Sequence, residues 1–365
     1  MHPFTLKIVL PVGISFYTFQ TLGYVIDVYR GDVKAENHFG VYAAFISYFP
    51  QLVAGPIERT CNLLPQIREE KFFDYKQASY GMKLMVWGFF KKLVVADVIS
   101  VYVDNVFGSL DNHKGCDLLL AVLFFAVQIY CDFSGYSDIA IGTAKLMGID
   151  LMTNFKSPYF SSSIREFWSR WHISLSTWFK DYVYIPLGGN RCTKLRNYFN
   201  LFVTFLISGL WHGANWTFII WGGIHGIAQI IEKQFGNCLA KIKRDKVICI
   251  CSCLCVFFFC CIAWIFFRAE SFSDAIYVLT HMFTGVVDTA LNIRVSLGLT
   301  LSKLLTILGC IALLGIYDYF SLKVDVIEKI SQKTIFVRYL FYFGIVFIIL
   351  TFRASGEAEF VYFQF

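Results

Sequence analysis

The chain has 365 residues, of which 57% are hydrophobic, 18% are aromatic and only 16% are charged. Soluble globular domains carry about a quarter charged residues, so this composition excludes an ordinary soluble protein and indicates a polytopic membrane protein. The formal net charge of +6 fits basic loops on the cytoplasmic side of a membrane, and no nucleic-acid partner is expected.

The N-terminal part of the chain contains apolar segments that are short for a full membrane crossing. Residues 4–26 form an apolar, aromatic segment that either spans the membrane or re-enters it. Residues 40–55 are interrupted by Pro50 and fall short of the roughly 20 residues of a crossing helix, so we expect a re-entrant or interfacial element. The polar residues 58–76 then predict an aqueous loop or a surface helix.

Residues 79–107 have the pattern of two amphipathic helices separated by Lys91, Lys92 and Asp97. A lysine in a membrane helix lowers its cost by extending its apolar stem, so that the ammonium group reaches the lipid headgroups. We therefore expect both lysine side chains to lie at a headgroup layer.

The next apolar span, residues 118–133, runs directly into the sequence CDFSGYSD, which contains Asp132 and Asp138. Ionisable groups within membrane segments are costly and often functional. These two carboxylates either cap a helix end at the interface or line a polar cavity inside the membrane. They are candidate supporting residues of a functional site.

Residues 162–185 predict one amphipathic helix with an aromatic face that must pack inward. Arg170 and Asp181 lie on a separate polar stripe, whereas His172 lies on the aromatic face and is a candidate site residue. The aromatic face consists of residues at three- and four-residue steps, namely Trp168, Trp171, His172, Leu175, Trp178, Phe179 and Tyr182.

Residues 197–231 carry no Asp, Glu, Lys or Arg over thirty-five positions, yet they contain two histidines. One straight helix of this length would measure roughly 52 Å, against a hydrocarbon core of about 30 Å. Glycines weaken helices, so we expect a hairpin that turns at residues 209–215 and holds His212 near its apex. A titratable ring there is either a hydrogen-bonded core residue or a group that handles protons in a reaction.

Three further apolar spans lie at residues 247–267, 300–320 and 334–352. With the earlier segments they give roughly seven to nine membrane elements, which we expect to form a single domain over residues 1–365. Four cysteines alternate at residues 249–255. On a helix they would lie on two opposed faces, so we expect small apolar residues and not the ligands of one metal.

Basic residues cluster at 191–196 and 233–246. Cytoplasmic loops of membrane proteins are enriched in Lys and Arg, which places both clusters in the cytoplasm. The hairpin between them then crosses the membrane an even number of times, and the apex with His212 lies away from the cytosol.

Several sequence blocks along nearly the whole chain carry a family resemblance, namely PVGISFYTFQTLGYVIDVYRG, FPQLVAGPIER, CDFSGYSDIAIG, REFWSRWHISLSTWFKDYVYIPLGGNR, SGLWHGANW, WGGIHG and VYFQF. Together these blocks resemble the membrane-bound O-acyltransferases, and within them the membrane subunit of the alginate O-acetylation machinery. Chains of that family usually carry further membrane helices before the first block, which begins here at Pro11. The sequence is therefore expected to represent an N-terminally short form of the family's fold.

The resemblance implies an all-α, polytopic membrane fold in which transmembrane and re-entrant helices form a ring around a tunnel. It implies that His212, in SGLWHGANW, is the active-site histidine and that His172, in RWHISLS, stands at the family's second active-site position. The family transfers an acyl group from a thioester to a hydroxyl. We therefore expect a multi-pass O-acyltransferase of the cytoplasmic membrane.

A neutral imidazole can take the proton of a hydroxyl that attacks a thioester, so His212 is assigned the role of general base. His172 is expected to position the donor or to stabilise the developing oxyanion. No bound cofactor or metal is expected. The candidate supporting residues are Trp211, Asn215, Asp181, Arg170, Asp132 and Asp138.

The expected donor is cytosolic acetyl-CoA or another acyl thioester. The expected partners are membrane lipids and an extracytoplasmic polysaccharide or partner acetyltransferase. One alternative is transfer of D-alanine or another acyl group from an acyl carrier protein to cell-wall polymers. The other alternative is a proton-coupled transporter in which His172, His212, Asp132 and Asp138 form a relay.

Overall fold

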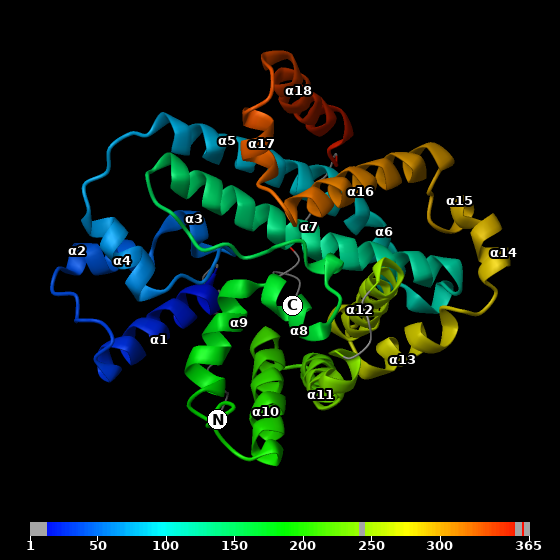
Figure 1. The fold of residues 1–365 in the computed structure, drawn as a ribbon. Coiled ribbons are helices and arrows are strands. Elements are labelled where there is room, and N and C mark those ends of the chain that lie inside the picture. The colour runs from blue at the N-terminus through cyan, green and yellow to red at the C-terminus, as the bar shows by residue number, and fades with distance from the viewer. Residues whose placement is uncertain (1–12, 241–244, 355–359, 361–365) are drawn as a thin grey trace, which may run out of the picture.

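The protein is described by a computed structural model that covers residues 13–240, 245–354 and 360. This part of the chain is helical and contains no β-strand, which confirms the all-α prediction (Figure 1). The segment predicted at residues 4–26 lies partly outside the described residues. Four of the described helices are long and apolar enough to cross a membrane, namely α7 (Cys116–Leu146), α12 (Lys246–Arg268), α16 (Leu301–Ser321) and α18 (Ile335–Phe352).

Short helices at the N-terminal end gather on one side of the molecule (Figure 1). The segment predicted at residues 40–55 forms two helices of eight and four residues, and Pro50 stands in the first turn of the second. Neither is long enough to cross a membrane. The elements of this region are α1 (Ile14–Arg30), α2 (Phe39–Ile46), α3 (Phe49–Leu52) and α4 (Thr60–Arg68).

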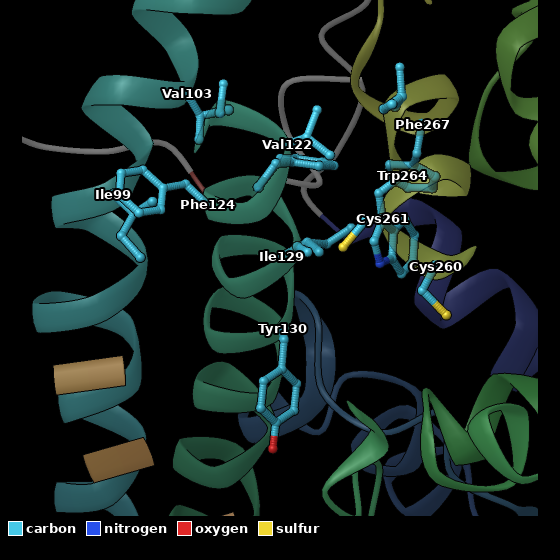
Figure 2. Close-up of a cluster of buried hydrophobic side chains, with 14 of the residues drawn as sticks. Ile99, Val103, Val122, Phe124, Ile129, Tyr130, Cys260, Cys261, Trp264 and Phe267 are labelled. Atoms are coloured by element: carbon cyan, nitrogen blue, oxygen red, sulfur yellow. The ribbon is translucent and has the colours of Figure 1, made fainter. Parts of the chain in front are cut away.

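Helix α7 is the centre of the fold. In its most apolar stretch 72% of the residues are buried, compared with 6% in α18. Helix α5 (Tyr75–Phe89) packs along α7, and a Cβ added to Gly88 would lie 2.6 Å from the carbonyl oxygen of Gly135. Such small residues let two membrane helices approach closely. Helix α6 (Asp97–Phe107) and α12 pack against α7 in the apolar core drawn in Figure 2.

Lys91 and Lys92 lie inside the protein, so the prediction that they reach the headgroups is wrong. They belong to a π-helical segment that joins α5 to α6 without a turn. Lys91 Nζ lies 2.7 Å from Asp138, and Lys92 Nζ lies 2.7 Å from Asp132 and 2.8 Å from Asp97. The carboxylates of the neighbouring helix α7 compensate the buried charges, and the pattern of one helix cannot reveal such partners.

The segment predicted as one helix at residues 162–185 is broken at residues 171–172, so that prediction is wrong. The predicted turn between two arms within residues 197–231 is confirmed, because the chain leaves the helix at residues 213–215. The elements are α8 (Ile164–Arg170), α9 (Ile173–Phe179), a π-helical segment (Lys180–Tyr184), α10 (Lys194–His212) and α11 (Trp216–Ala240).

Shorter helices connect the last membrane spans. Three of them lead from α12 to α16, and one lies between α16 and α18 (Figure 1). The helices α12, α16 and α18 agree with the spans predicted at residues 247–267, 300–320 and 334–352. The connecting helices are α13 (Phe272–His281), α14 (Val286–Leu291), α15 (Ile293–Ser296) and α17 (Val326–Ser331).

The contact between α5 and α7 is tested by substituting Gly88 with leucine. Because the α7 backbone occupies the space that a side chain would need, we expect Gly88→Leu to destabilise the protein by at least the roughly 1–3 kcal/mol typical of overpacking. Thermal unfolding of the purified protein in detergent measures the effect. Gly309→Leu on α16, where an added Cβ meets nothing within 4 Å, is the matched control. Equal unfolding midpoints for the two variants would contradict the proposed close approach.

Candidate active site

His172 occupies the break between α8 and α9. Its φ of 43° lies in the left-handed region, which residues with a Cβ adopt only at a cost. The residue is buried, with 1% of its surface exposed. Strain of this kind persists only where surrounding contacts fix the residue, and it favours a functional role for the ring.

A single asparagine holds the His172 ring. His172 Nδ1 lies 3.0 Å from Asn154 Oδ1, which also accepts a hydrogen bond from the Ser174 backbone N–H at 3.3 Å. A backbone N–H can only donate, so the Asn154 atom is the oxygen and His172 Nδ1 carries a proton. In the neutral ring the lone pair is therefore on Nε2, which is buried without a hydrogen-bond partner among the described residues.

The loop before α4 supports this arrangement from outside the membrane spans. The Ile57 N–H donates to Ser174 Oγ at 3.0 Å. Glu58 accepts hydrogen bonds from Asn62 Nδ2 at 2.6 Å and from the Met152 N–H, two residues before the asparagine. Burial raises the pKa of the Glu58 carboxyl to about 7, although these hydrogen bonds lower it. The block FPQLVAGPIER therefore positions the residues around the buried histidine.

Trp211 lies between the two predicted active-site histidines. Its ring centroid is 4.7 Å from that of His212 and 6.5 Å from that of His172. His212 is the last residue of α10 and is partly exposed. Further aromatic neighbours of His212 include Trp221 at 5.1 Å, Phe267 at 5.0 Å and Phe218 at 6.4 Å. The fold thus brings Trp211 and His212 next to His172, which precedes His212 by 40 residues in the sequence.

Aromatic side chains enclose His172 on its remaining sides. Phe133 of α7 contacts the ring edge-on at 4.5 Å, and Phe16 of α1 stacks on it at 6.3 Å. Phe360, near the C-terminal end, packs against Phe133 at 6.3 Å and against Tyr136 at 5.6 Å. The site is therefore built from segments at both ends of the chain.

Three residues of the site, His225, Trp221 and Asn154, were not among those predicted. His225 is fully buried on α11 and accepts a hydrogen bond from Trp168 Nε1 at 3.2 Å. Trp221 lies 5.1 Å from both His212 and His225, so it joins the two rings. His225 carries the same signal as His212, a titratable ring in an uncharged stretch. Asn154 carries no sequence signal, because an asparagine in a loop is ordinary.

A cavity of about 810 Å³ lies between α8–α9 and α10–α11. It is lined by Leu175, one turn after His172, and by Ser208, one turn before His212. Basic residues also line it, namely Arg165, Lys180 and Lys233. The cavity therefore combines cationic groups with walls that belong to the two histidine-bearing elements.

A second cavity, of about 530 Å³, lies at the closed end of the α10–α11 hairpin. It is lined by Gly213, which directly follows His212, and by Trp216, Arg268 and Glu270. Trp216 is 73% exposed. This cavity approaches His212 from the end of the helices opposite to the basic cluster at residues 191–196.

The other predicted supporting residues make contacts of their own. The carboxylates of α7 form the ion pairs with the buried lysines described above. Asp181, Arg170 and Asn215 are held by neighbouring groups and can shape the surroundings of the histidines only indirectly through these partners. Their partners are Arg59 for Asp181, Glu166 for Arg170 and the Glu270 carbonyl for Asn215, each at 2.7 Å.

Comparison with known proteins gives matches along most of the chain. The probable alginate O-acetylase AlgI of Pseudomonas putida is 38% identical over 100% of this chain and 77% of its own length. The peptidoglycan O-acetyltransferase of Helicobacter pylori is 38% identical over 77% of this chain and 58% of its own length. The teichoic acid D-alanyltransferase of Streptococcus thermophilus is 31% identical over 64% of this chain and 60% of its own length.

The family assignment rests on these relatives and on a match between the central region of the chain and the sequence model of a protein family. Residues 33–272 match the membrane-bound O-acyltransferase family. These matches confirm the resemblance to the alginate-type proteins. They also confirm the expected enzyme class, a multi-pass membrane O-acyltransferase. This chain belongs to the membrane-bound O-acyltransferase family.

Proposed function

We propose that this chain transfers an acetyl or other short acyl group from a thioester donor to a hydroxyl, with His212 as the general base. The observation that carries the proposal is that His212 and His172 lie on either side of Trp211. One cavity, lined by basic residues, lies between the two elements that carry these histidines, and a second cavity lies beside His212 at the opposite end of the α10–α11 hairpin. This arrangement lets two substrates meet from the two sides of a membrane.

The chemistry requires a base because a hydroxyl has a pKa far above neutrality. His212 takes the hydroxyl proton while the oxygen forms a bond to the thioester carbonyl carbon. The carbon–sulfur bond then breaks, and the proton passes to the leaving thiolate, so no net proton is consumed. General base catalysis of this kind contributes roughly 10² to 10⁴ in rate.

The hydrogen-bond pattern of His172 favours one of its two expected roles. With the proton on Nδ1, its Nε2 accepts hydrogen bonds and cannot donate one to an oxyanion. We therefore assign His172 to the positioning of a substrate that donates a hydrogen bond, such as the attacking hydroxyl or the amide of a thioester donor. The oxyanion must then be stabilised by other donors.

The cavity of about 810 Å³ is the proposed path of the donor. Acetyl-CoA and the prosthetic group of an acyl carrier protein both carry phosphates, which Arg165, Lys180 and Lys233 would attract. Basic loops lie in the cytoplasm by the positive-inside bias, so the donor would come from the cytosolic side of a cell membrane.

The cavity beside His212 is the proposed site of the acceptor. The exposed ring of Trp216 offers an apolar face for a sugar ring, and Arg268 and Glu270 offer hydrogen-bonding groups at its side. The names of the relatives support a polysaccharide acceptor, or a partner acetyltransferase that passes the acyl group on to one. The similarity to a D-alanyltransferase supports the carrier-dependent alternative.

The transporter alternative has less support. A proton relay requires carboxylates that gain and lose protons during each cycle. Asp132 and Asp138 instead form ion pairs with Lys92 and Lys91 at 2.7 Å, and these pairs give the carboxylates a structural role between α7 and the segment that joins α5 to α6.

The role of His212 is tested by His212→Ala. Loss of the general base is expected to lower acyl transfer at least 10²-fold, while the amount of protein in the membrane stays the same. Transfer of a radiolabelled acetyl group from acetyl-CoA to polysaccharide in isolated membranes measures the effect. His281→Ala, at the end of α13, is the control and is expected to retain activity. Full activity of the His212 variant would overturn the proposed base.

The donor path is tested by removing two of its cations. The double variant Arg165→Ala, Lys180→Ala is expected to raise the KM for a phosphate-bearing thioester severalfold with a smaller effect on kcat, because binding is weakened and the histidines are untouched. Lys76→Ala, an exposed lysine at the start of α5, is the control. An unchanged KM for both acetyl-CoA and an acyl carrier protein would show that the donor uses another path.

A further inference from the structure

A third cavity, of about 840 Å³, plays no part in the proposed reaction. It lies between α5 and α7 on one side and the junction of α16 with α17 on the other, and the segment before α8 lines a further side. Tyr80, Tyr130 and Asp325 are among its lining residues. Tyr80 donates to Asp325 at 2.6 Å and Tyr130 donates to Asp318 at 2.7 Å, so these hydrogen bonds fasten the C-terminal helices to the core across the cavity.

The charges that line this cavity do not balance. Its three carboxylates are already engaged, two with the tyrosines just named and one, Asp138, with Lys91 at 2.7 Å. Five cationic side chains line the same space, namely Lys91, Lys145, Lys156, Arg170 and Lys323. Lys91 pairs with Asp138 of the lining, and Lys145 and Arg170 pair with Asp150 and Glu166 just outside it. Lys156 and Lys323 have no such partner among the described residues, and these two lysines suit the cavity to an anion.

Three of these cations, Arg170, Lys156 and Lys323, have side-chain N–H groups that no described residue uses and that are free to bind a further acceptor. Arg170 Nη2 binds Glu166, whereas Arg170 Nη1 is buried without a hydrogen-bond partner in the described part of the chain. Lys156 and Lys323 form no ion pair with any described carboxylate. A buried guanidinium N–H left unsatisfied is costly, and a phosphate oxygen would satisfy it.

We propose that this cavity binds the phosphate of an anionic phospholipid headgroup. Arg170, Lys156 and Lys323 would hold the phosphate. Its acyl chains would lie along Leu322 and Val324, which line the cavity and are 39% and 41% exposed. Basic cavities between membrane helices on the cytoplasmic side are suited to such headgroups.

The position of the cavity favours a lipid over a soluble phosphate compound. Helix α16 borders it, and only 22% of the most apolar stretch of α16 is buried within the protein, which leaves much apolar surface of this helix for contact with lipid. The lysine-bearing connection between α16 and α18 lies at its edge and is cytoplasmic by the same bias that orients the hairpin. A bound headgroup would bridge α5–α7 to α16–α17 and stabilise their packing.

The experiment compares thermal unfolding of the purified full chain in nanodiscs of phosphatidylcholine with and without phosphatidylglycerol. We expect phosphatidylglycerol to raise the unfolding midpoint of the unmodified protein and of the control Lys329→Ala, an exposed residue of α17 outside the cavity. The double variant Lys156→Ala, Lys323→Ala is expected to lose this rise, and Lys156→Arg, Lys323→Arg is expected to retain it.

Further conditions separate the possible sources of the phosphate. Equal lipid-dependent rises in the Lys→Ala double variant and in the control would overturn the site. Inorganic phosphate that reproduces the rise in phosphatidylcholine alone would assign the cavity to a soluble ion and overturn the lipid. Stabilisation by coenzyme A that the Lys→Ala variant abolishes would assign it to the acyl donor and also overturn the proposal. None of these measurements depends on acyl transfer.

Discussion

The geometry of the site depends on one hydrogen bond, from His172 Nδ1 to Asn154 Oδ1. This bond fixes the ring in a backbone conformation that a histidine adopts only under constraint, and it decides which ring nitrogen carries the proton. The constraint extends outward through Ser174 to the backbone of Ile57. A loop outside the membrane spans therefore sets the protonation pattern of a ring in the buried interior.

Two interruptions of helical structure bring the imidazoles together. The chain breaks at His172 between α8 and α9 and leaves the helix after His212 between α10 and α11. In the second case glycines let the hairpin arms approach, because an added Cβ at Gly209 would meet the Phe218 carbonyl. Trp211, in the last turn of α10, lies beside both breaks, with its ring centroid 6.5 Å from that of His172 and 4.7 Å from that of His212. Both imidazoles of the candidate site thus lie where helical structure is interrupted.

The sequence predicts one of these interruptions and not the other. The hairpin follows from a charge-free run that is too long for a single crossing, with glycines where it must turn. The break at His172 is hidden because aromatic residues continue at helical spacing on both of its sides, so the periodicity is the same with or without the break. Asn154 and the partners of Lys91 and Lys92 were equally out of reach, because they come from elements distant in the sequence. Hydropathy predicts which segments enter the membrane, and tertiary packing decides which polar groups meet there.

The distribution of charge within the protein fits the proposed role of a histidine as general base. A general base must be neutral before it reacts, and the rings around His172 and His212 are aromatic and uncharged. Cationic side chains instead line a separate cavity, and Phe155 belongs to both places, since it lines that cavity and stacks on His172 at 6.4 Å. A low local dielectric would make a nearby charge act strongly on an imidazole. Keeping the ammonium and guanidinium groups behind an aromatic side chain, with carboxylates to compensate three of them, would let one membrane domain hold these charges only a few side chains away from the proposed histidine base.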